Sequence, residues 1–405
     1  MGTSFSMKFA TLACVCGVLL SVACSNDEDP SDTPGTVCPE EAVNVSANGT
    51  ANSYIVAPGS IAVFDASHKG NSTTETVGEG AEVRLVWQDT QGLIEKIGYT
   101  ADRRIIVWTA AKSGNGVVAV ADATGAILWS WHIWVVDYTP AASLFTTPAN
   151  ALGTTWSFMD RNLGALNTTP GSFDAFGMIY QWGRKDPLAP ACEWTDMNDD
   201  YTYNVDGEKP LYDIDNKTLI KTRLKTEYHG TIAKSLMQPD VFFAMTYKHT
   251  GKLDEFGNEI VENDYRTKDW VDVSNDDYWG GVSGKKSIYD PCPTGYKVPT
   301  CDTGGNTPYA WLVFAKMTWD VANHGCTQDG QWFPTAGTRV YASGGLDCTG
   351  VYSGLWIGTA GKASSNLEEF PDLYGQYMFI INGKRTFKVS KDARSQGLSV
   401  RCVKE

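Results

Sequence analysis

The sequence has little positive charge, few histidines and no long hydrophobic run beyond its N-terminus. Among 405 residues, 33 lysines and arginines stand against 47 aspartates and glutamates, so the net charge is −14, and histidines number only 5. Because no basic stripe is available to neutralise phosphates, we predict no nucleic-acid partner. Past the first residues, no apolar segment reaches the roughly 18 residues that a membrane-spanning helix needs.

The usual catalytic and metal-binding motifs are also missing. The sequence contains no His-Glu-x-x-His, Gly-x-Ser-x-Gly, Cys-x-x-Cys or dinucleotide-binding glycine pattern. Residues 280–287 (GGVSGKKS) are glycine-rich like a phosphate loop, but their spacing differs from that motif. Acidic clusters at 199–200, 213–216 and 254–255 have a composition that suits calcium, yet they lack the EF-hand order and fit solvated loops equally well. We therefore predict no catalytic residues and no cofactor, and we assign no metal site.

The N-terminus has the composition of a secretion signal. Lys8 precedes the 12-residue apolar stretch 9–20 (FATLACVCGVLL), which is too short to span a membrane and is followed by small residues. Cys24 comes directly after Ala23, an arrangement that resembles a bacterial lipoprotein signal. The resemblance implies that residues 1–23 are removed and that the thiol of Cys24 receives lipid. An ordinary signal peptide with an incidental cysteine is the alternative.

Residues 24–39 are predicted to form an acidic tether. The segment offers almost no apolar side chain for a folded core to bury, so we expect it to be flexible. Its Asp27-Glu28-Asp29 run resembles the signal that sends lipoproteins of Bacteroidetes to the outer face of the outer membrane. The sequence therefore predicts a lipid-anchored protein that is exposed on the surface of the cell outer membrane.

Residues 40–140 show the pattern of a β-sandwich. Short runs rich in β-branched and aromatic residues alternate with glycine-containing turns, and about seven strands in roughly 100 residues are typical of an immunoglobulin-like domain. In the last run, period-two alternation places Trp129 and Trp131 on one face and Ser130 and His132 on the other. We expect the tryptophans to pack in the core, although such a cluster also suits stacking on sugars.

Residues 141–405 have longer loops and carry four separate motifs. These are 156–165 (WSFMDRNLGA), 177–187 (GMIYQWGRKDP), 288–300 (IYDPCPTGYKVPT) and 397–404 (GLSVRCVK). In this order they resemble the Fibrobacter succinogenes major paralogous domain (FISUMP), a family of surface proteins of Bacteroidetes. The resemblance implies a C-type-lectin-like α+β fold in which the ends of the domain meet and long loops build the upper surface. We therefore expect a multidomain chain, with an all-β immunoglobulin-like sandwich before an α+β lectin-like domain that contains an insert at 192–279.

The residues of this second domain also support local predictions. Residues 308–320 (PYAWLVFAKMTWD) are the best helix candidate, since apolar side chains recur at three- and four-residue spacings. Segments 376–381 and 398–403 are expected to be strands. Within the motifs, we expect aromatic core anchors at Trp156, Tyr180 and Trp182. The neighbouring charged residues fit structural ion pairs better than catalytic groups, and they are Asp160, Arg161, Arg184, Lys185 and Asp186.

Removal of the signal and acylation of Cys24 leave seven cysteines in an oxidising exterior, which favours disulfides. They are Cys38, Cys192, Cys292, Cys301, Cys326, Cys348 and Cys402. We expect Cys292 to pair with Cys402, because this bridge would tie the last strand to the middle of the domain. Cys326 with Cys348 is a further candidate pair that rests only on proximity in a glycine-rich stretch.

The insert is rich in tyrosine and tryptophan beside polar residues. Such rings suit stacking on sugar faces and suit protein contacts equally well, and ordinary packing explains many of them. The candidate ligand-binding residues are Trp194, Tyr201, Trp270, Tyr278 and Trp279. We predict a non-catalytic, adhesin-like surface protein whose partner is a glycan or a cell-surface protein. The alternatives are a hydrolase that acts on surface polysaccharide and a structural, fimbria-associated subunit of a surface assembly.

Overall fold

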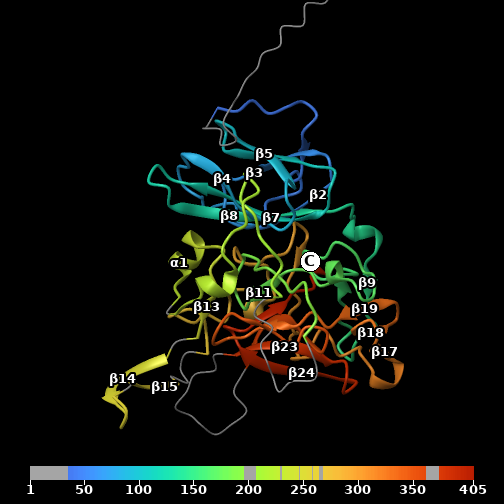
Figure 1. Ribbon diagram of the computed structural model, residues 1–405. Coiled ribbons are helices and arrows are strands. Elements are labelled where there is room, and N and C mark those ends of the chain that lie inside the picture. Colours follow the sequence, from blue (N-terminus) through green and yellow to red (C-terminus); the bar gives the residue numbers. More distant parts are fainter. Residues whose placement is uncertain are drawn as a thin grey trace, which may run out of the picture.

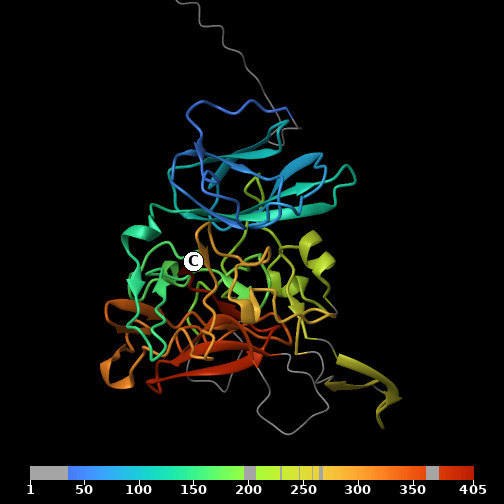
Figure 2. The ribbon, with the colours of Figure 1, turned by 180° about the vertical axis from the view of Figure 1, so that it is seen from behind.

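Strands make up most of the regular secondary structure of the described residues, and they form a β-sandwich beside a larger β-rich domain (Figures 1 and 2). The computed structural model describes residues 35–195, 207–228, 230–245, 247–257, 259–263, 268–361 and 374–405. The predicted signal, Cys24 and most of the predicted tether lie outside the described residues. No helix in the described part of the chain is long and apolar enough to cross a membrane.

The N-terminal domain consists of two four-stranded sheets. The first joins Val43–Asn44 (β1), Ile61–Asp65 (β3), Arg104–Thr109 (β6) and Ile94–Tyr99 (β5) in that order. The second joins Ser53–Val56 (β2), Ile127–Val135 (β8), Gly114–Ala121 (β7) and Glu82–Gln88 (β4). Neighbouring strands are antiparallel except for the parallel pairs β1–β3 and β2–β8. The predicted sandwich of short strands is thus present.

Strand β8 is buried on both of its faces. Trp129, Trp131 and the alternate residues that follow them pack in the sandwich core, which confirms the predicted face. Ser130 and His132 on the opposite face are also buried, because the C-terminal domain covers this side of the sheet. Trp134 on the same face belongs to the core of the C-terminal domain.

Buried polar groups connect the two domains beneath β8. Lys185 Nζ lies 2.6 Å from Asp186 Oδ1, and Ser130 Oγ donates a hydrogen bond to the same carboxylate oxygen at 2.7 Å. Lys185 also donates to the carbonyl of Ser130 at 2.9 Å. The predicted structural ion pairs are confirmed for Lys185–Asp186 and for Arg161–Asp160, whose closest atoms lie 2.9 Å apart.

The C-terminal domain is built around a seven-stranded sheet. Its path runs through Leu346–Asp347 (β21), Thr338–Arg339 (β20), Gly397–Ser399 (β25), Tyr352–Gly361 (β22), Tyr374–Ile381 (β23) and Thr386–Ala393 (β24), and Ile179–Gln181 (β11) pairs with β25. A second sheet joins Tyr296–Lys297 (β16), Val403–Lys404 (β26), Ser157–Phe158 (β10) and Phe145–Thr146 (β9). Because β10 pairs with β26, the two ends of this domain lie side by side.

Smaller elements complete the described part of the domain. Its other strands are Glu227–Tyr228 (β12), Phe243–Ala244 (β13), Tyr247–Leu253 (β14), Glu259–Asn263 (β15), Thr318–Asp320 (β17), Gly325–Gln328 (β18) and Gln331–Pro334 (β19). One-turn 3-10 helices are Pro140–Ala142, Phe173–Ala175, Thr222–Lys225, Gly281–Ser283 and Phe314–Lys316. The single α-helix among the described residues is Ile232–Met237 (α1), which begins after Thr231, whose side chain accepts from the Lys234 N–H.

The predicted helix over 308–320 is wrong. The segment contains one 3-10 turn and then strand β17. Gln328 on β18 explains the difference, because its side chain accepts from the Val313 N–H at 2.8 Å and donates to the Trp311 carbonyl at 3.0 Å. These bonds satisfy backbone groups that a helix would pair internally.

The predicted disulfide between Cys292 and Cys402 is confirmed, with a Cα–Cα distance of 6.0 Å. It ties the end of the chain to the segment before β16. The other candidate pair is wrong, because Cys326 and Cys348 are both free. Cys326 packs with Phe333 in an apolar core, where a buried cysteine behaves as a small hydrophobic residue.

Candidate functional site

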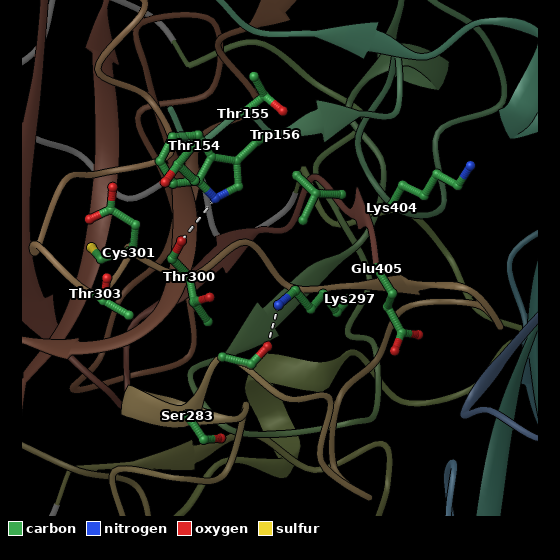
Figure 3. Close-up of a pocket in the computed structure, with 13 residues that line it drawn as sticks. Thr154, Thr155, Trp156, Ser283, Lys297, Thr300, Cys301, Thr303, Lys404 and Glu405 are labelled. Atoms are coloured by element: carbon green, nitrogen blue, oxygen red, sulfur yellow. Dashed lines mark hydrogen bonds between the residues drawn. The ribbon is translucent and has the colours of Figure 1, made fainter. Parts of the chain in front are cut away.

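A polar pocket of about 420 Å³ lies beside the sheet formed by β16, β26, β10 and β9 (Figure 3). Residues 154–156, 283–284, 297, 300–303 and 403–405 supply its walls. The pairing of β26 with both β10 and β16 brings these distant segments together. The lining combines one indole and two lysines with hydroxyl-bearing residues, which are Thr154, Thr155, Ser283, Thr300 and Thr303.

The indole of Trp156 lies along one side of the pocket (Figure 3). Its Nε1–H donates to the Thr300 carbonyl at 3.1 Å, and its backbone N–H donates to Thr147 Oγ1 at 3.0 Å. The half-buried ring also packs against the apolar cluster that contains Phe158 and Tyr309. Trp156 therefore serves partly as the predicted core anchor and partly as a fixed wall of the pocket.

A glycine-rich turn forms the opposite side of the pocket. Gly280 (φ +87) and Gly284 (φ +65) flank the 3-10 turn Gly281–Ser283. A Cβ atom at Gly280 would lie 1.9 Å from the Lys285 carbonyl oxygen, so this position requires glycine. The Gly284 carbonyl accepts a hydrogen bond from the ammonium group of Lys297. The segment that lacks phosphate-loop spacing thus contributes a shaped backbone to the pocket.

Asp302 organises the loop at another edge of the pocket. Its carboxylate accepts hydrogen bonds from the backbone N–H groups of Gly304 and Asn306, both at 2.9 Å, and from Asn150 Nδ2 at 2.6 Å. Hydrogen bonding by the Asn306 side chain, with further donors from Asn150 and the loop backbone, lowers the pKa of Asp302 to about 2. The carboxylate is therefore ionised at neutral pH, and its oxygens are engaged in holding the loop.

Cys301 is the one thiol that lines the pocket. Burial raises the pKa of the Cys301 thiol, and Sγ lies 3.5 Å from Gln376 Oε1, to which it donates. The thiol is therefore protonated at neutral pH, and a protonated thiol is a weak nucleophile and a weak metal ligand.

Two more charged groups lie near the pocket. Lys286 is nearly buried and donates to the carbonyls of Cys292 and Pro293 at 2.8 and 2.7 Å, and burial lowers its pKa. The carboxylate of Glu405, which lines the pocket, lies 4.0 Å from Lys286 Nζ. Lys404 is exposed, and its side chain extends away from the other lining residues (Figure 3).

Three of the predicted ligand-binding rings lie in the protein core, so these assignments are wrong. Trp270 and Trp279 are each 1% exposed and Tyr278 is 8% exposed. The polar atoms of these rings are already used, since Trp270 Nε1 donates to the Trp182 carbonyl at 2.7 Å and the Tyr278 hydroxyl donates to the Val273 carbonyl at 3.0 Å. Polar neighbours in sequence did not indicate exposure here, because the rings turn inward toward the central sheet.

Trp194 is the predicted ligand-binding ring that keeps an exposed part in the described structure, and Tyr201 lies outside the described residues. The Trp194 ring stacks on His324 at a centroid distance of 3.9 Å and contacts Phe173 at 4.3 Å. A Cβ atom at Gly350 would lie 2.8 Å from the Trp194 ring, so glycine there makes room for the stack. This Trp194–His324 surface is a second aromatic feature, and none of its residues lines the pocket.

Lys297 and the hydroxyl-bearing residues of the pocket were not predicted as a site from the sequence. Their sequence signal is weak, because threonines and an isolated lysine are common in loops. The informative signal is the pairing of the last strand with β10 and β16, which cannot be read from spacing alone.

Among the described residues, no group of three or more histidine, cysteine, aspartate or glutamate side chains is placed to hold a metal ion. No family model, curated protein or solved structure matches this chain.

Proposed function

We propose that this chain is a surface-exposed, lipid-anchored protein that binds a glycan without catalysis. The observation that supports this most directly is the meeting of a fixed, half-buried indole with several hydroxyl groups in one pocket. A cavity of about 420 Å³ is within the roughly 300–1,000 Å³ typical of ligand pockets. A sugar ring offers an apolar face for an aromatic ring and hydroxyls for polar partners, so its chemistry matches this lining.

The chemistry of the lining residues supports binding rather than turnover. The Cys301 thiol is protonated, and the Asp302 carboxylate is occupied by its own loop. A hydrolase that acts on polysaccharide would instead use two free carboxyl groups on either side of the scissile bond.

We infer an immunoglobulin-like sandwich followed by a C-type-lectin-like domain of the FISUMP type. The two four-stranded sheets with a parallel β2–β8 pair support the first part. Pairing of β10 with β26, together with the disulfide to Cys402, supports the second part, since both hold the ends of the domain together.

The anchor and the outer-membrane location rest on the N-terminal sequence. In cells fed labelled palmitate, we expect label on the wild-type protein and none on a Cys24→Ser variant. Added protease should digest the wild-type protein on intact cells if it faces the exterior. An unlabelled wild-type protein found in the cytosol would contradict the anchor and the location together.

A glycan array tests the binding function. The probe is the Cys24→Ser full chain, which stays unacylated, applied with and without calcium. We expect binding that Trp156→Ala abolishes and Trp194→Ala preserves. Loss of glycan binding in Trp194→Ala but not in Trp156→Ala would place the ligand on the Trp194–His324 surface and contradict the pocket as the binding site. Turnover of a polysaccharide by the same protein would overturn the non-catalytic assignment.

A further inference from the structure

Lys297 brings a positive charge into the pocket without a carboxylate partner. Within the described part of the chain, no carboxylate lies at ion-pair distance from its ammonium, and its partner there is the Gly284 carbonyl. The side chain is half-buried, and Figure 3 shows it extending into the pocket. Two of its three N–H groups therefore remain for other acceptors.

The two acidic side chains that line the pocket, Asp302 and Glu405, form no ion pair with Lys297 in the described part of the chain. The oxygens of Asp302 are taken by loop donors. Glu405 lies close to the buried Lys286, and in Figure 3 its carboxylate and the Lys297 ammonium point to different sides. The lining holds two lysines and two carboxylates, so the pocket as a whole has no excess of positive charge, and Lys297 is a local cationic donor on a molecule whose net charge is −14.

A hydroxyl and the ammonium converge on one spot beside Gly284. A Cβ atom built on Gly284 would lie 3.2 Å from Thr300 Oγ1 and 3.7 Å from Lys297 Nζ. The Thr300 hydroxyl and the Lys297 ammonium therefore approach the same side of Gly284. An anionic oxygen bound between these two groups would accept hydrogen bonds from both, and such charge-assisted bonds are the stronger kind.

We propose that the pocket selects an anionic saccharide, that is, a sugar carrying a carboxylate or a sulfate group. The anion would lie beside Gly284 against Lys297 and Thr300, while the sugar ring faces Trp156. This inference rests on the proposed glycan-binding function and specifies its ligand class. Long-range attraction cannot produce such binding, because an acidic protein repels anions at a distance, so the preference depends on the local lysine.

The test compares neutral, uronate-containing and sulfated glycans on one array, using the Cys24→Ser full chain, and then measures the best ligand by calorimetry. We expect the bound glycans to be anionic. Comparing the binding of uronate-containing and sulfated glycans shows whether a carboxylate or a sulfate is preferred. Lys297→Gln should weaken binding by about ten- to hundredfold, as loss of a charge-assisted hydrogen bond does. Lys297→Arg should retain much of the affinity. Lys384→Gln removes an exposed lysine that does not line the pocket, and this control should bind like the parent protein.

The outcomes separate this inference from the function on which it rests. Binding of neutral glycans only, or equal affinity in the parent protein and Lys297→Gln, would overturn the anionic preference and leave glycan binding intact. Absence of binding to every glycan would overturn both. Circular dichroism and the urea unfolding midpoint of each variant establish that a lost affinity reflects the pocket and not the fold.

Discussion

His132 has both ring nitrogens occupied where the sandwich meets the C-terminal domain. Asn115 Nδ2 donates to Asp89 Oδ2 and to the Gly164 carbonyl, at 3.0 Å each, so Asn115 Oδ1 is the acceptor of the amide group. His132 Nε2 lies 3.0 Å from Asn115 Oδ1 and therefore carries the hydrogen, which leaves Nδ1 to accept from Ser53 Oγ at 3.0 Å. Complete burial lowers the pKa of His132 to about 3.

This depressed pKa predicts acid sensitivity that His132→Gln should reduce. In the unfolded chain the imidazole titrates near its ordinary pKa of 6.5, whereas in the folded protein it stays neutral down to about 3. Stability is therefore full above pH 6.5 and falls by up to about 1.4 kcal/mol per pH unit as the pH drops from 6.5 toward 3. Urea unfolding at pH 7 and pH 5 should show the wild type losing about 2 kcal/mol more than the variant. Equal losses would contradict a neutral buried His132.

The buried Lys185–Asp186 pair predicts that Asp186→Asn lowers the free energy of unfolding strongly, although it changes the shape of the side chain very little. Asp186→Asn keeps the shape of the side chain but leaves a lysine that is 1% exposed without its counter-charge. Removing one partner of a buried ion pair costs about 3–5 kcal/mol, and urea unfolding at pH 7 measures this loss. Asp215→Asn is the control, because its pair with Lys217 is exposed and should leave the free energy of unfolding unchanged. Similar behaviour of the two variants would contradict a structural role for the buried pair.

At the scale of elements, the disulfide fastens strand β26 to the segment before β16. Cys292 and Cys402 are 110 residues apart, and closing a loop of that size stabilises the folded state by about 4–5 kcal/mol in the chain-entropy picture. We expect Cys292→Ser/Cys402→Ser to lower the urea midpoint and to weaken glycan binding, since β26 supplies part of the pocket wall. Dithiothreitol should lower the midpoint of the wild type and leave that of the double variant unchanged. A double variant as stable as the wild type would contradict this role.

Elements with a strong local pattern were predictable from the sequence, and those that depend on distant partners were not. The alternation from Trp129 to Trp131 placed one face of β8 in the core correctly, but no local signal showed that the face of His132 is covered too. The 308–320 segment has helical spacing, yet Gln328 from a neighbouring strand captures its backbone groups. The spacing of apolar residues along a segment predicts the type of that one element. Burial and hydrogen bonding also depend on the other elements that pack against it.

The candidate site was beyond sequence reasoning for the same reason. Its walls come from segments near residues 154, 300 and 404, which meet only through strand pairing. Clusters of aromatic residues in the insert favoured a site there, and three of those rings are buried. The number of aromatic residues in a segment does not show which rings are exposed, because packing against other elements decides whether each ring lies in the core or on the surface.

At the scale of the whole molecule, residues from one face of the sandwich form part of the core of the C-terminal domain. Trp87, Val117 and Trp134 from the sandwich belong to the same buried apolar cluster as Tyr180 and Trp182 from the C-terminal domain. The interface also contains the buried ion pair and the hydrogen bonds of His132, so separating the domains would expose both apolar surface and unpaired polar groups. Although the topology defines two domains, we therefore expect them to unfold together as one cooperative unit.

This shared core predicts one cooperative unfolding transition for the full chain. Calorimetry and tryptophan fluorescence should report the same midpoint, because unfolding of either domain removes the partner surface of the other. A fragment of residues 138–405 should be less stable than the full chain or aggregate, since it loses the sandwich residues that cover Tyr180 and Lys185. Asp186→Asn should lower the single midpoint of the full chain without splitting the transition. Two separate transitions, or a fragment as stable as the full chain, would show instead that the interface is a contact between independent domains.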